Sequence, residues 1–230
     1  MLAAAKRKSR KELLKEPDVI MTWSARMLAV ATAHKQAIVY GVIGLLAAAA
    51  LYSGYQYYSY WQEAQAGLLI DAAVAKYERL RAGDPPEKAA KAVAEDFQRI
   101  IAAYGSRFNG NTARLIYANL LYEAGDFSQA ADLYRALQGQ FSEFPLIRFQ
   151  VIQSLGYTLV ALKEDAAAAR TFETALAAAD PRLAAGVLYE LGTLYARMGQ
   201  AEKSTAAFNR ILSEHPDSAY APLAKERVSS

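Results

Sequence analysis

The sequence predicts an all-α protein in which one N-terminal transmembrane helix precedes an α-solenoid of about four helical hairpins and a C-terminal capping helix. Three observations predict this fold class. Residues 36–62 form a run without a charge, bounded by Lys35 and Glu63. Beyond residue 63, apolar residues recur at spacings of three and four, the period of an amphipathic helix. Equivalent residues there return after 37, 38 and 36 positions.

The uncharged run 36–62 has the length and composition of a membrane span. Its residues 37–55 are mostly apolar, and as an α-helix they would extend about 28 Å, close to the hydrocarbon thickness of a bilayer. Alanine and glycine dilute the hydrophobicity of this segment, so a fully buried helix of a soluble protein is the alternative. We expect a transmembrane helix at 36–62.

Aromatic residues crowd the end of this run, at 51–61, where six of eleven side chains are aromatic and none is charged. Tyrosine and tryptophan favour the membrane–water interface, because the ring meets lipid while the hydroxyl or indole N–H meets water. The stretch predicts an aromatic belt where the span leaves the membrane. The residues expected at the membrane interface are Trp23, Tyr52, Tyr55, Tyr57, Tyr58, Tyr60 and Trp61.

The distribution of charge predicts the orientation of the span. Residues 1–35 carry eight Lys/Arg and three Asp/Glu, a net charge of +5, whereas residues 36–230 carry eighteen and twenty, a net charge of −2. Short positively charged flanks stay in the cytoplasm. We expect a single-pass protein of the bacterial inner membrane, with residues 1–35 in the cytoplasm and residues 63–230 in the periplasm.

A cleaved signal peptide is the alternative to a lasting anchor. The flank of 35 residues before the apolar run is long for a signal peptide, although Ala48 and Ala50 offer a cleavage site. The helical pattern continues through Trp61 and Gln62. We therefore expect the anchor to remain uncleaved.

The cytoplasmic part has two sections. Residues 6–15 hold six basic residues in ten, which sets the topology and attracts anionic lipid; nucleic-acid binding has no aromatic or fold signal to support it. The second section is an amphipathic helix, expected either to lie along the inner leaflet or to dock on a cytoplasmic partner. Its apolar face comprises Val19, Ile20, Trp23, Met27, Val30 and Ala31.

Composition argues against an enzyme. The chain has 230 residues, no cysteine and only two histidines, His34 and His215, which lie on opposite sides of the expected membrane. Thiol catalysis, disulfides and thiolate metal sites are therefore excluded, and a zinc site or a histidine-based triad has too few ligands. The sequence has no glycine-rich phosphate loop. We expect no catalytic residue, no cofactor and no metal.

A pattern of small and large residues at fixed spacings runs through 188–216. Its members are Leu188, Leu191, Gly192, Tyr195, Gly199, Phe208 and Pro216. With the small residue Ser204 near the start of the second helix, the pattern resembles the tetratricopeptide repeat, a unit of two antiparallel helices. In that repeat the small residues mark the close approach of the two helices, the large ones fill the gap between hairpins, and the proline ends the second helix.

The same frame fits three upstream units. One contains Ile152, Leu155, Gly156, Leu159, Ala168, Phe172 and Ala175, with Pro181 one place late. The unit before it contains Ala118, Leu121, Gly125, Ala130 and Tyr134, and a longer turn then leads to Pro145. The first unit retains only Phe97 and Gly105, with a break between its helices at 84–86. A final helix at about 220–228 is expected to cap the solenoid; an unrelated helical bundle is the alternative.

The resemblance implies a concave groove lined by the first helix of each hairpin, which binds other proteins. Three tyrosines there form a ladder that offers a large contact area, and amide side chains pair with a peptide backbone; the alternative is that the rings only pack between helices. The groove lacks the Lys/Asn set of carboxylate-clamp repeats, and Arg197 alone does not replace it. The residues expected in the groove are Asn119, Tyr122, Glu123, Gln150, Gln153, Tyr157, Tyr189, Thr193 and Arg197.

Small residues also mark one side of the predicted span. Ala37, Gly41, Gly44 and Ala48 are spaced by four, three and four, so they share a helix face. Such a face lets a second transmembrane helix approach closely. We expect it to contact a membrane complex or a second copy of the span, and a lipid-facing surface is the alternative.

The whole layout resembles the single-span periplasmic tetratricopeptide proteins of the bacterial inner membrane, typified by the YfgM-like ancillary subunit of the Sec translocon. This resemblance implies an interaction scaffold that assists protein translocation and hands clients to periplasmic chaperones. A structural subunit of a respiratory, pilus or division assembly is the alternative. The expected partners are a membrane complex through the span, chaperones or clients through the groove, and membrane lipid. No nucleic acid and no small-molecule substrate are expected.

Overall fold

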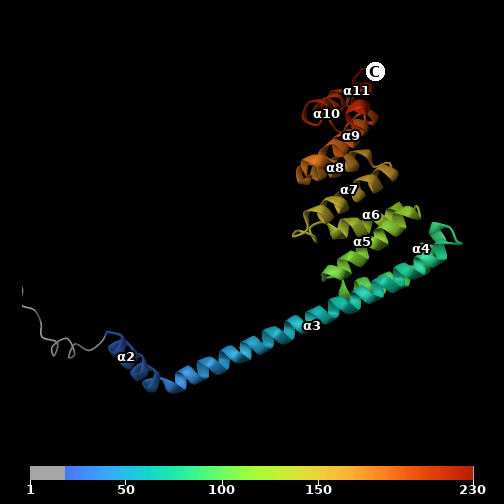
Figure 1. The fold of residues 1–230 in the computed structure, drawn as a ribbon. Helices are drawn as coiled ribbons and strands as arrows, with labels where there is room; N and C mark the ends of the chain where they lie inside the picture. The colour runs from blue at the N-terminus through green and yellow to red at the C-terminus, as the bar shows by residue number, and fades with distance from the viewer. Residues whose placement is uncertain (1–18, 230) are drawn as a thin grey trace, which may run out of the picture. The chain divides into compact units, whose positions relative to one another are not determined.

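The computed structural model describes residues 19–229, and in this part of the chain every regular element is a helix (Figure 1). The basic cluster at 6–15 lies outside the described residues, as do the side chains of Val19 and Ile20. The helices are α2 (Val19–Ala33), α3 (Lys35–Arg81), α4 (Pro86–Tyr104), α5 (Phe108–Glu123), α6 (Phe127–Leu137), α7 (Pro145–Ala161), α8 (Asp165–Ala178), α9 (Pro181–Arg197), α10 (Ala201–Glu214) and α11 (Ala221–Ser229). The chain divides into two compact units between Tyr60 and Trp61.

The first unit holds α2 and the first part of α3, and its large apolar side chains from Trp23 to Tyr60 are exposed. Helix α3 is long and apolar enough to cross a membrane, with a mean hydropathy of 1.8 over its most apolar window and none of that window buried. Arg26 is the single charged residue within α2. The helix expected before the span is present as α2, and α3 continues unbroken through Gln62 as predicted.

The second unit is a solenoid of four helical hairpins and a last helix, as predicted. Three hairpins are α5 with α6, α7 with α8, and α9 with α10, and α11 packs on α10. The other hairpin is α3 with α4, whose buried residues share one core. We call the first helix of each hairpin helix A and the second helix B. Each helix B also contacts the helix A that follows it. The core is therefore continuous along the stack, as in other repeat proteins.

The predicted small residues lie where helix A and helix B come closest. A Cβ atom added to Gly156 would meet the ring of Phe172 at 2.7 Å, and one added to Gly192 would meet the ring of Phe208 at 2.6 Å. The hydroxyl of Ser204 is buried and donates a hydrogen bond of 2.8 Å to the carbonyl oxygen of Gly192. Larger side chains at these positions would separate the two helices.

In three of the hairpins, the turn between helix A and helix B contains one residue in the left-handed conformation. Gly125 and Gly199 have φ angles of +81° and +71°, while Lys163 occupies the equivalent place with φ +61°. Glycine is favoured there because it has no Cβ to clash with the following carbonyl oxygen. The sequence pattern identified the two glycines and missed that Lys163 takes the same conformation.

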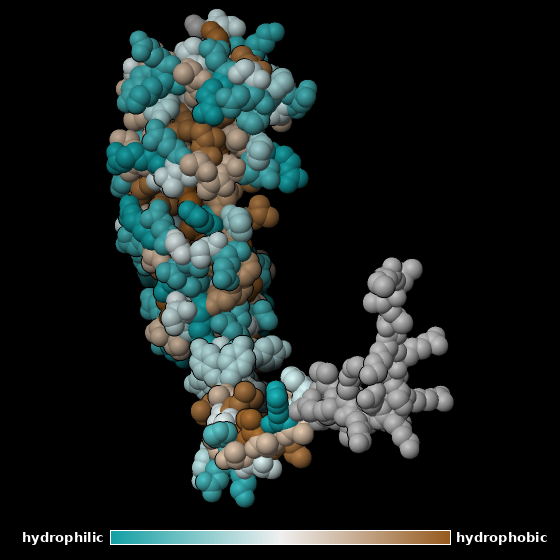
Figure 2. All heavy atoms as spheres, turned by 90° about the vertical axis from the view of Figure 1, so that its left-hand side faces the viewer, coloured by the Kyte–Doolittle hydropathy of each residue, from teal (hydrophilic) through white to brown (hydrophobic). Residues whose placement is uncertain are grey.

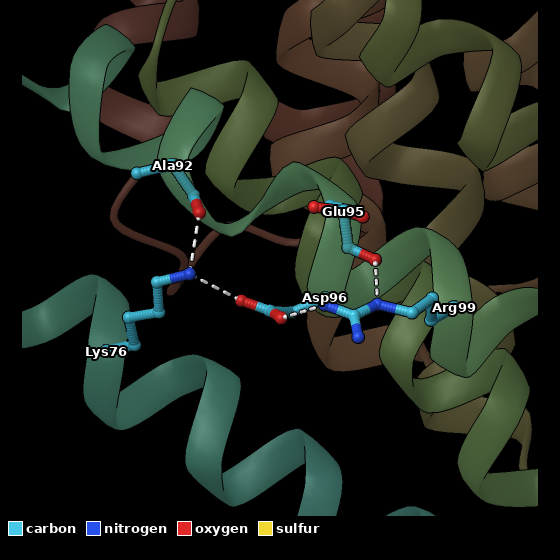
Figure 3. A network of polar contacts seen from close by, with 5 residues as sticks. All are labelled: Lys76, Ala92, Glu95, Asp96 and Arg99. Carbon is cyan, nitrogen blue, oxygen red and sulfur yellow. Dashed lines mark hydrogen bonds and ion pairs between the residues drawn. The ribbon is translucent and has the colours of Figure 1, made fainter.

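The first hairpin, whose repeat pattern is weakest, is closed by a polar network (Figure 3). The Lys76 ammonium on α3 reaches across to α4, where it donates to Asp96 Oδ2 at 2.7 Å and to the carbonyl oxygen of Ala92 at 2.8 Å. Arg99 Nη2 holds the other oxygen of Asp96 at 3.0 Å. These contacts belong to the second part of α3, so one helix serves as both the apolar segment and helix A of the first hairpin.

Candidate functional site

Four tyrosines follow one another along the A helices and the last turn of the solenoid. They are Tyr122 on α5, Tyr157 on α7, Tyr189 on α9 and Tyr220 just before α11, and we call them the tyrosine row. The phenol of Tyr157 interacts electrostatically with those of Tyr122 and Tyr220. The rings of Tyr189 and Tyr220 have centroids 5.6 Å apart. Three of the four were predicted to line the groove; Tyr220 was not.

Each predicted tyrosine of the row also packs against a ring of its own helix B. The centroid distances are 5.3 Å from Tyr122 to Phe127, 5.3 Å from Tyr157 to Phe172 and 5.6 Å from Tyr189 to Phe208. Tyr122 is 37% exposed, and the other rings of the row are half-buried. The rings therefore pack on one side and retain exposed surface on the other, so packing does not preclude contact with a partner.

Two carboxylates on the A helices lie near tyrosine hydroxyls, Glu123 near Tyr77 and Glu190 near Tyr157 of the row. Glu123 accepts a hydrogen bond of 3.1 Å from the Tyr77 hydroxyl, which connects α5 to α3. Glu190 lies next to Tyr157, where burial raises the pKa of its carboxyl group and the Tyr157 hydroxyl partly offsets that rise. Burial raises the pKa of Tyr157 to about 12, and the charge of Glu190 adds to this effect. The surface thus combines aromatic area with negative charge.

Two further groove residues serve internal contacts. Asn119 accepts a hydrogen bond of 2.6 Å from the hydroxyl of Tyr134, whose pKa burial raises to about 12. Thr193 donates to the carbonyl oxygen of Tyr189 within α9 at 3.0 Å. These two side chains stabilise the helices that hold the tyrosine row.

The remaining predicted groove residues differ in their surroundings. Gln150 is exposed and Gln153 is half-buried, both on α7. Arg197 at the end of α9 forms an ion pair with Asp165 at the start of α8, which joins two hairpins. Arg197 is thus already engaged within the solenoid.

Sequence reasoning did not single out Tyr77, Glu190 or Tyr220. Tyr77 belongs to the hairpin with the weakest repeat pattern, and Tyr220 precedes a helix that was expected only to cap the stack. Glu190 follows a predicted groove residue, Tyr189, by one position. The ring of Tyr220 lies so close to Gly186 that a Cβ there would meet it at 3.2 Å. A small residue opposite an aromatic one was the available signal for Tyr220.

The residues predicted to contact membrane components are all exposed. They lie in the first unit, except Trp61, which is the first residue of the second unit. The small-residue face comprises Ala37, Gly41, Gly44 and Ala48, all exposed. A Cβ added to Gly41 or Gly44 meets nothing within 4 Å. The expected interface residues are exposed by 48–75%: Trp23, Tyr52, Tyr55, Tyr57, Tyr58, Tyr60 and Trp61.

Within residues 19–229, no cluster of three or more His, Cys, Asp or Glu side chains has the geometry of a metal site. The candidate binding surfaces among the described residues are the tyrosine row with its two carboxylates and the exposed apolar part of α3.

Comparison with known proteins identifies the repeats. Residues 34–153 match the model of the tetratricopeptide repeat-like domain, and residues 187–218 match that of the tetratricopeptide repeat. A solved structure from a functional characterization of Pseudomonas aeruginosa pilF is similar to this chain, with 15% sequence identity and a TM-score of 0.48. The match covers 73% of this chain and 84% of the pilF chain. The crystal structure of YrrB, described as a TPR protein with an unusual peptide-binding site, has 19% sequence identity to this chain and a TM-score of 0.32. The match covers 67% of this chain and 99% of the YrrB chain. No curated protein sequence matches the chain.

Proposed function

The chain belongs to the tetratricopeptide repeat-like domain family, and on that premise we propose that it is a membrane-anchored scaffold whose tyrosine row binds an extended segment of a partner protein. Repeat proteins of this architecture present long surfaces for protein partners. The proposal thus has two parts, an anchor and a binding surface.

The continuity of α3 is the observation that carries the anchor. One helix runs from Lys35 to Arg81, with an uncharged and exposed first part and a second part packed in the first hairpin. The family match begins at residue 34 and includes the whole of α3 as well as α4–α6. Cleavage at Ala48 or Ala50 would divide this helix and the matched domain. These facts favour an anchor that stays attached to the solenoid.

The tyrosine row supports the binding surface. Tyrosine offers a large and rigid contact area at a low cost in side-chain entropy, and it is enriched among residues that dominate binding energy. Glu123 and Glu190 add negative charge, and each is bonded to tyrosine hydroxyls. This surface suits an extended segment that carries apolar and basic side chains.

We assign the scaffold to the periplasmic side of a bacterial inner membrane, as an accessory of protein translocation that hands emerging clients to chaperones. The positive charge of residues 1–35 supports this orientation. A second candidate is a structural subunit of a respiratory, pilus or division assembly. The small-residue face of α3 favours it, because such a face suits stable packing against another transmembrane helix.

Photo-crosslinking in native membranes tests both candidates. A photoreactive residue is placed at Tyr157 in the tyrosine row, at Gly44 in the span, or at the exposed Thr174 on helix B of the same hairpin as a control. Mass spectrometry then identifies the captured proteins. We expect Tyr157 to capture chaperones or nascent exported chains and Gly44 to capture a translocon subunit, with Thr174 capturing neither.

Each other outcome has a definite meaning. Capture of fixed subunits of one other assembly at both Tyr157 and Gly44 would make the chain a structural component there. Equal capture at Tyr157 and Thr174 would remove the tyrosine row as a binding surface. Gly44 crosslinks to soluble cytoplasmic proteins alone would contradict the anchor.

A further inference from the structure

Large apolar side chains stay exposed where two A helices of the solenoid begin. Phe108 at the start of α5 is 42% exposed, Phe144 before α7 is 44% exposed, and Leu146 in its first turn is 70% exposed. The ring centroids of Phe108 and Phe144 are 5.0 Å apart, so residues distant in sequence form one cluster. We call these three residues the apolar edge.

Hydrogen bonds accepted by Glu63 connect the apolar edge to α3. The two carboxylate oxygens of Glu63 accept from the backbone N–H of Phe108 at 3.2 Å and of Asn109 at 2.9 Å, and the Asn109 side-chain amide donates to the Glu63 carbonyl oxygen at 2.8 Å. The carboxylate thus caps the first turn of α5, a helix end that favours negative charge. The start of α5 is held beside residue 63 of α3.

This position matters because of where residue 63 lies in the sequence. Glu63 is the first charged residue after the uncharged run 36–62, and it follows Trp61 by two positions. The proposed membrane surface therefore lies at about this level of α3. The hydrogen bonds to Glu63 hold the Phe108 end of the apolar edge beside this same residue of α3.

The surroundings of the edge suit lipid headgroups better than hydrocarbon. Arg107, Glu143 and Arg148 flank the apolar side chains in sequence, and the last two are exposed. The side of the solenoid that faces left in Figure 1 shows apolar surface set among hydrophilic surface (Figure 2). Aromatic rings mixed with charged groups are characteristic of the membrane–water interface.

We propose that the apolar edge rests in the headgroup region of the membrane that α3 spans, which gives the solenoid a second membrane contact. This inference rests on the proposed anchor. Its occupant is a lipid surface, because the edge is attached to α3 beside the exit of the span. As a consequence, the start of α5 at Phe108 is the end of that helix nearest the membrane. Tyr122 comes fourteen residues later on α5 and therefore lies about 21 Å further along the helix, away from the membrane.

Spin labelling of the full chain tests the contact, and the absence of native cysteine makes single labels straightforward. Cysteines are placed at Leu146 and Phe144 in the apolar edge, at the exposed Ser128 near the other end of α5, and at Leu45 in the span. The protein is reconstituted into phosphatidylethanolamine–phosphatidylglycerol vesicles. Power saturation then compares collisions of each label with oxygen, which concentrates in lipid, and with a water-soluble nickel chelate.

The expected result is that labels at Leu146 and Phe144 lose nickel collisions and gain oxygen collisions relative to the label at Ser128. Labels at the edge that match the one at Ser128, with Leu45 in lipid, would overturn the membrane contact and leave the anchor intact. Low collision rates with both reagents would indicate a protein contact instead and would equally overturn it. A water-exposed label at Leu45 would refute the anchor itself, and the edge contact with it.

Discussion

Two sets of four residues in α3 share the spacing of four, three and four and differ in what covers them. The set in the first part of the helix is exposed: Ala37, Gly41, Gly44 and Ala48. The set in the second part is buried: Ala66, Ile70, Ala73 and Tyr77. Within each set, the four residues share one face of the helix, because this spacing follows the period of 3.6 residues per turn.

The second set includes large side chains, and the chain itself provides their cover. Ile70, Ala73 and Tyr77 join the core formed with α4 and α5. The first set has only small side chains, which are exposed in the first unit. Helical spacing therefore indicates a face, while the size of the side chains and the neighbouring elements determine whether the chain buries it. The proposed cover for the first set is a second transmembrane helix.

The largest expected effect is on the buried set. Tyr77→Ala removes a ring that is 2% exposed and its hydrogen bond to Glu123, so we expect a loss of about 3–5 kcal/mol in the free energy of unfolding of the solenoid. Tyr57→Ala, in the exposed part of the same helix, removes a ring that is 75% exposed and should change that free energy by less than about 0.5 kcal/mol. Denaturant titration in detergent micelles, followed by circular dichroism, measures both. Equal losses would contradict the contrast between the two parts of α3.

Alkaline pH should destabilise the packed unit through its buried phenols. Burial raises the pKa of Tyr134 to about 12 from the ordinary value of 10.0 for a tyrosine, so between these pH values the unfolded chain loses a proton that the folded chain retains. Stability is therefore full below pH 10 and falls as pH rises, by at most about 2–3 kcal/mol for this residue.

The variant Tyr134→Phe isolates this effect. It should lose about 1 kcal/mol at pH 8 with the hydrogen bond to Asn119, and it should then fall less steeply than the parent from pH 10 to 12. Unfolding titrations at pH 8, 10, 11 and 12 make the comparison. A parent and a variant that lose stability in parallel above pH 10 would show that Tyr134 does not carry the dependence.

A smaller effect is expected at the junction between the two parts of α3. Glu63→Ala removes both hydrogen bonds to the start of α5, which should cost about 1–2 kcal/mol, the usual range for loss of a helix cap. Glu87→Ala, in the first turn of α4 where no side chain caps the helix, is the matched control and should cost a few tenths of a kcal/mol. Unfolding in micelles distinguishes the two, and equal costs would exclude a specific role for the Glu63 cap.

The smallest effect on stability is expected in the exposed set. Gly44→Leu meets no neighbour in the chain, so the free energy of unfolding of the solenoid should change by less than about 0.5 kcal/mol. The same substitution fills the proposed contact face and should abolish capture of the membrane partner. Ile43→Leu, one position away and with an exposed side chain, should preserve that capture. Undiminished capture by Gly44→Leu would show that the small residues do not form the contact.

Much of the fold followed from local patterns in the sequence. The helical period, the proline and glycine turns and the recurring residues such as Phe172 and Phe208 predicted four hairpins and a last helix, because each hairpin repeats the same packing between neighbours. The first hairpin was the hardest to predict, since its repeat pattern is weak and its contacts include an ion pair between Lys76 and Asp96 that no repeat position announces. Lys163 shows a similar limit, because a lysine gives no local signal for a left-handed turn.

The candidate surface was predicted only in part. Tyr122, Tyr157 and Tyr189 follow from repeat positions, but their nearness to Tyr220 and Glu190 depends on how successive hairpins stack. Asn119 and Arg197 have the right repeat positions, yet Tyr134 and Asp165 engage them. Partners of this kind come from other hairpins or the opposite helix, so no local pattern announces them.

Sequence alone was sufficient for what depends on neighbours along the chain: the uncharged run, the aromatic stretch at its end, the charge difference between its flanks and the repeat of helix pairs. Tertiary structure was required for what depends on residues distant in sequence. It brings Glu63 to the start of α5, Phe108 to Phe144, and Tyr77 to Glu123. The physical reason is that periodicity arises within a helix of 3.6 residues per turn, whereas these contacts arise from the packing of hairpins whose side chains meet across the stack.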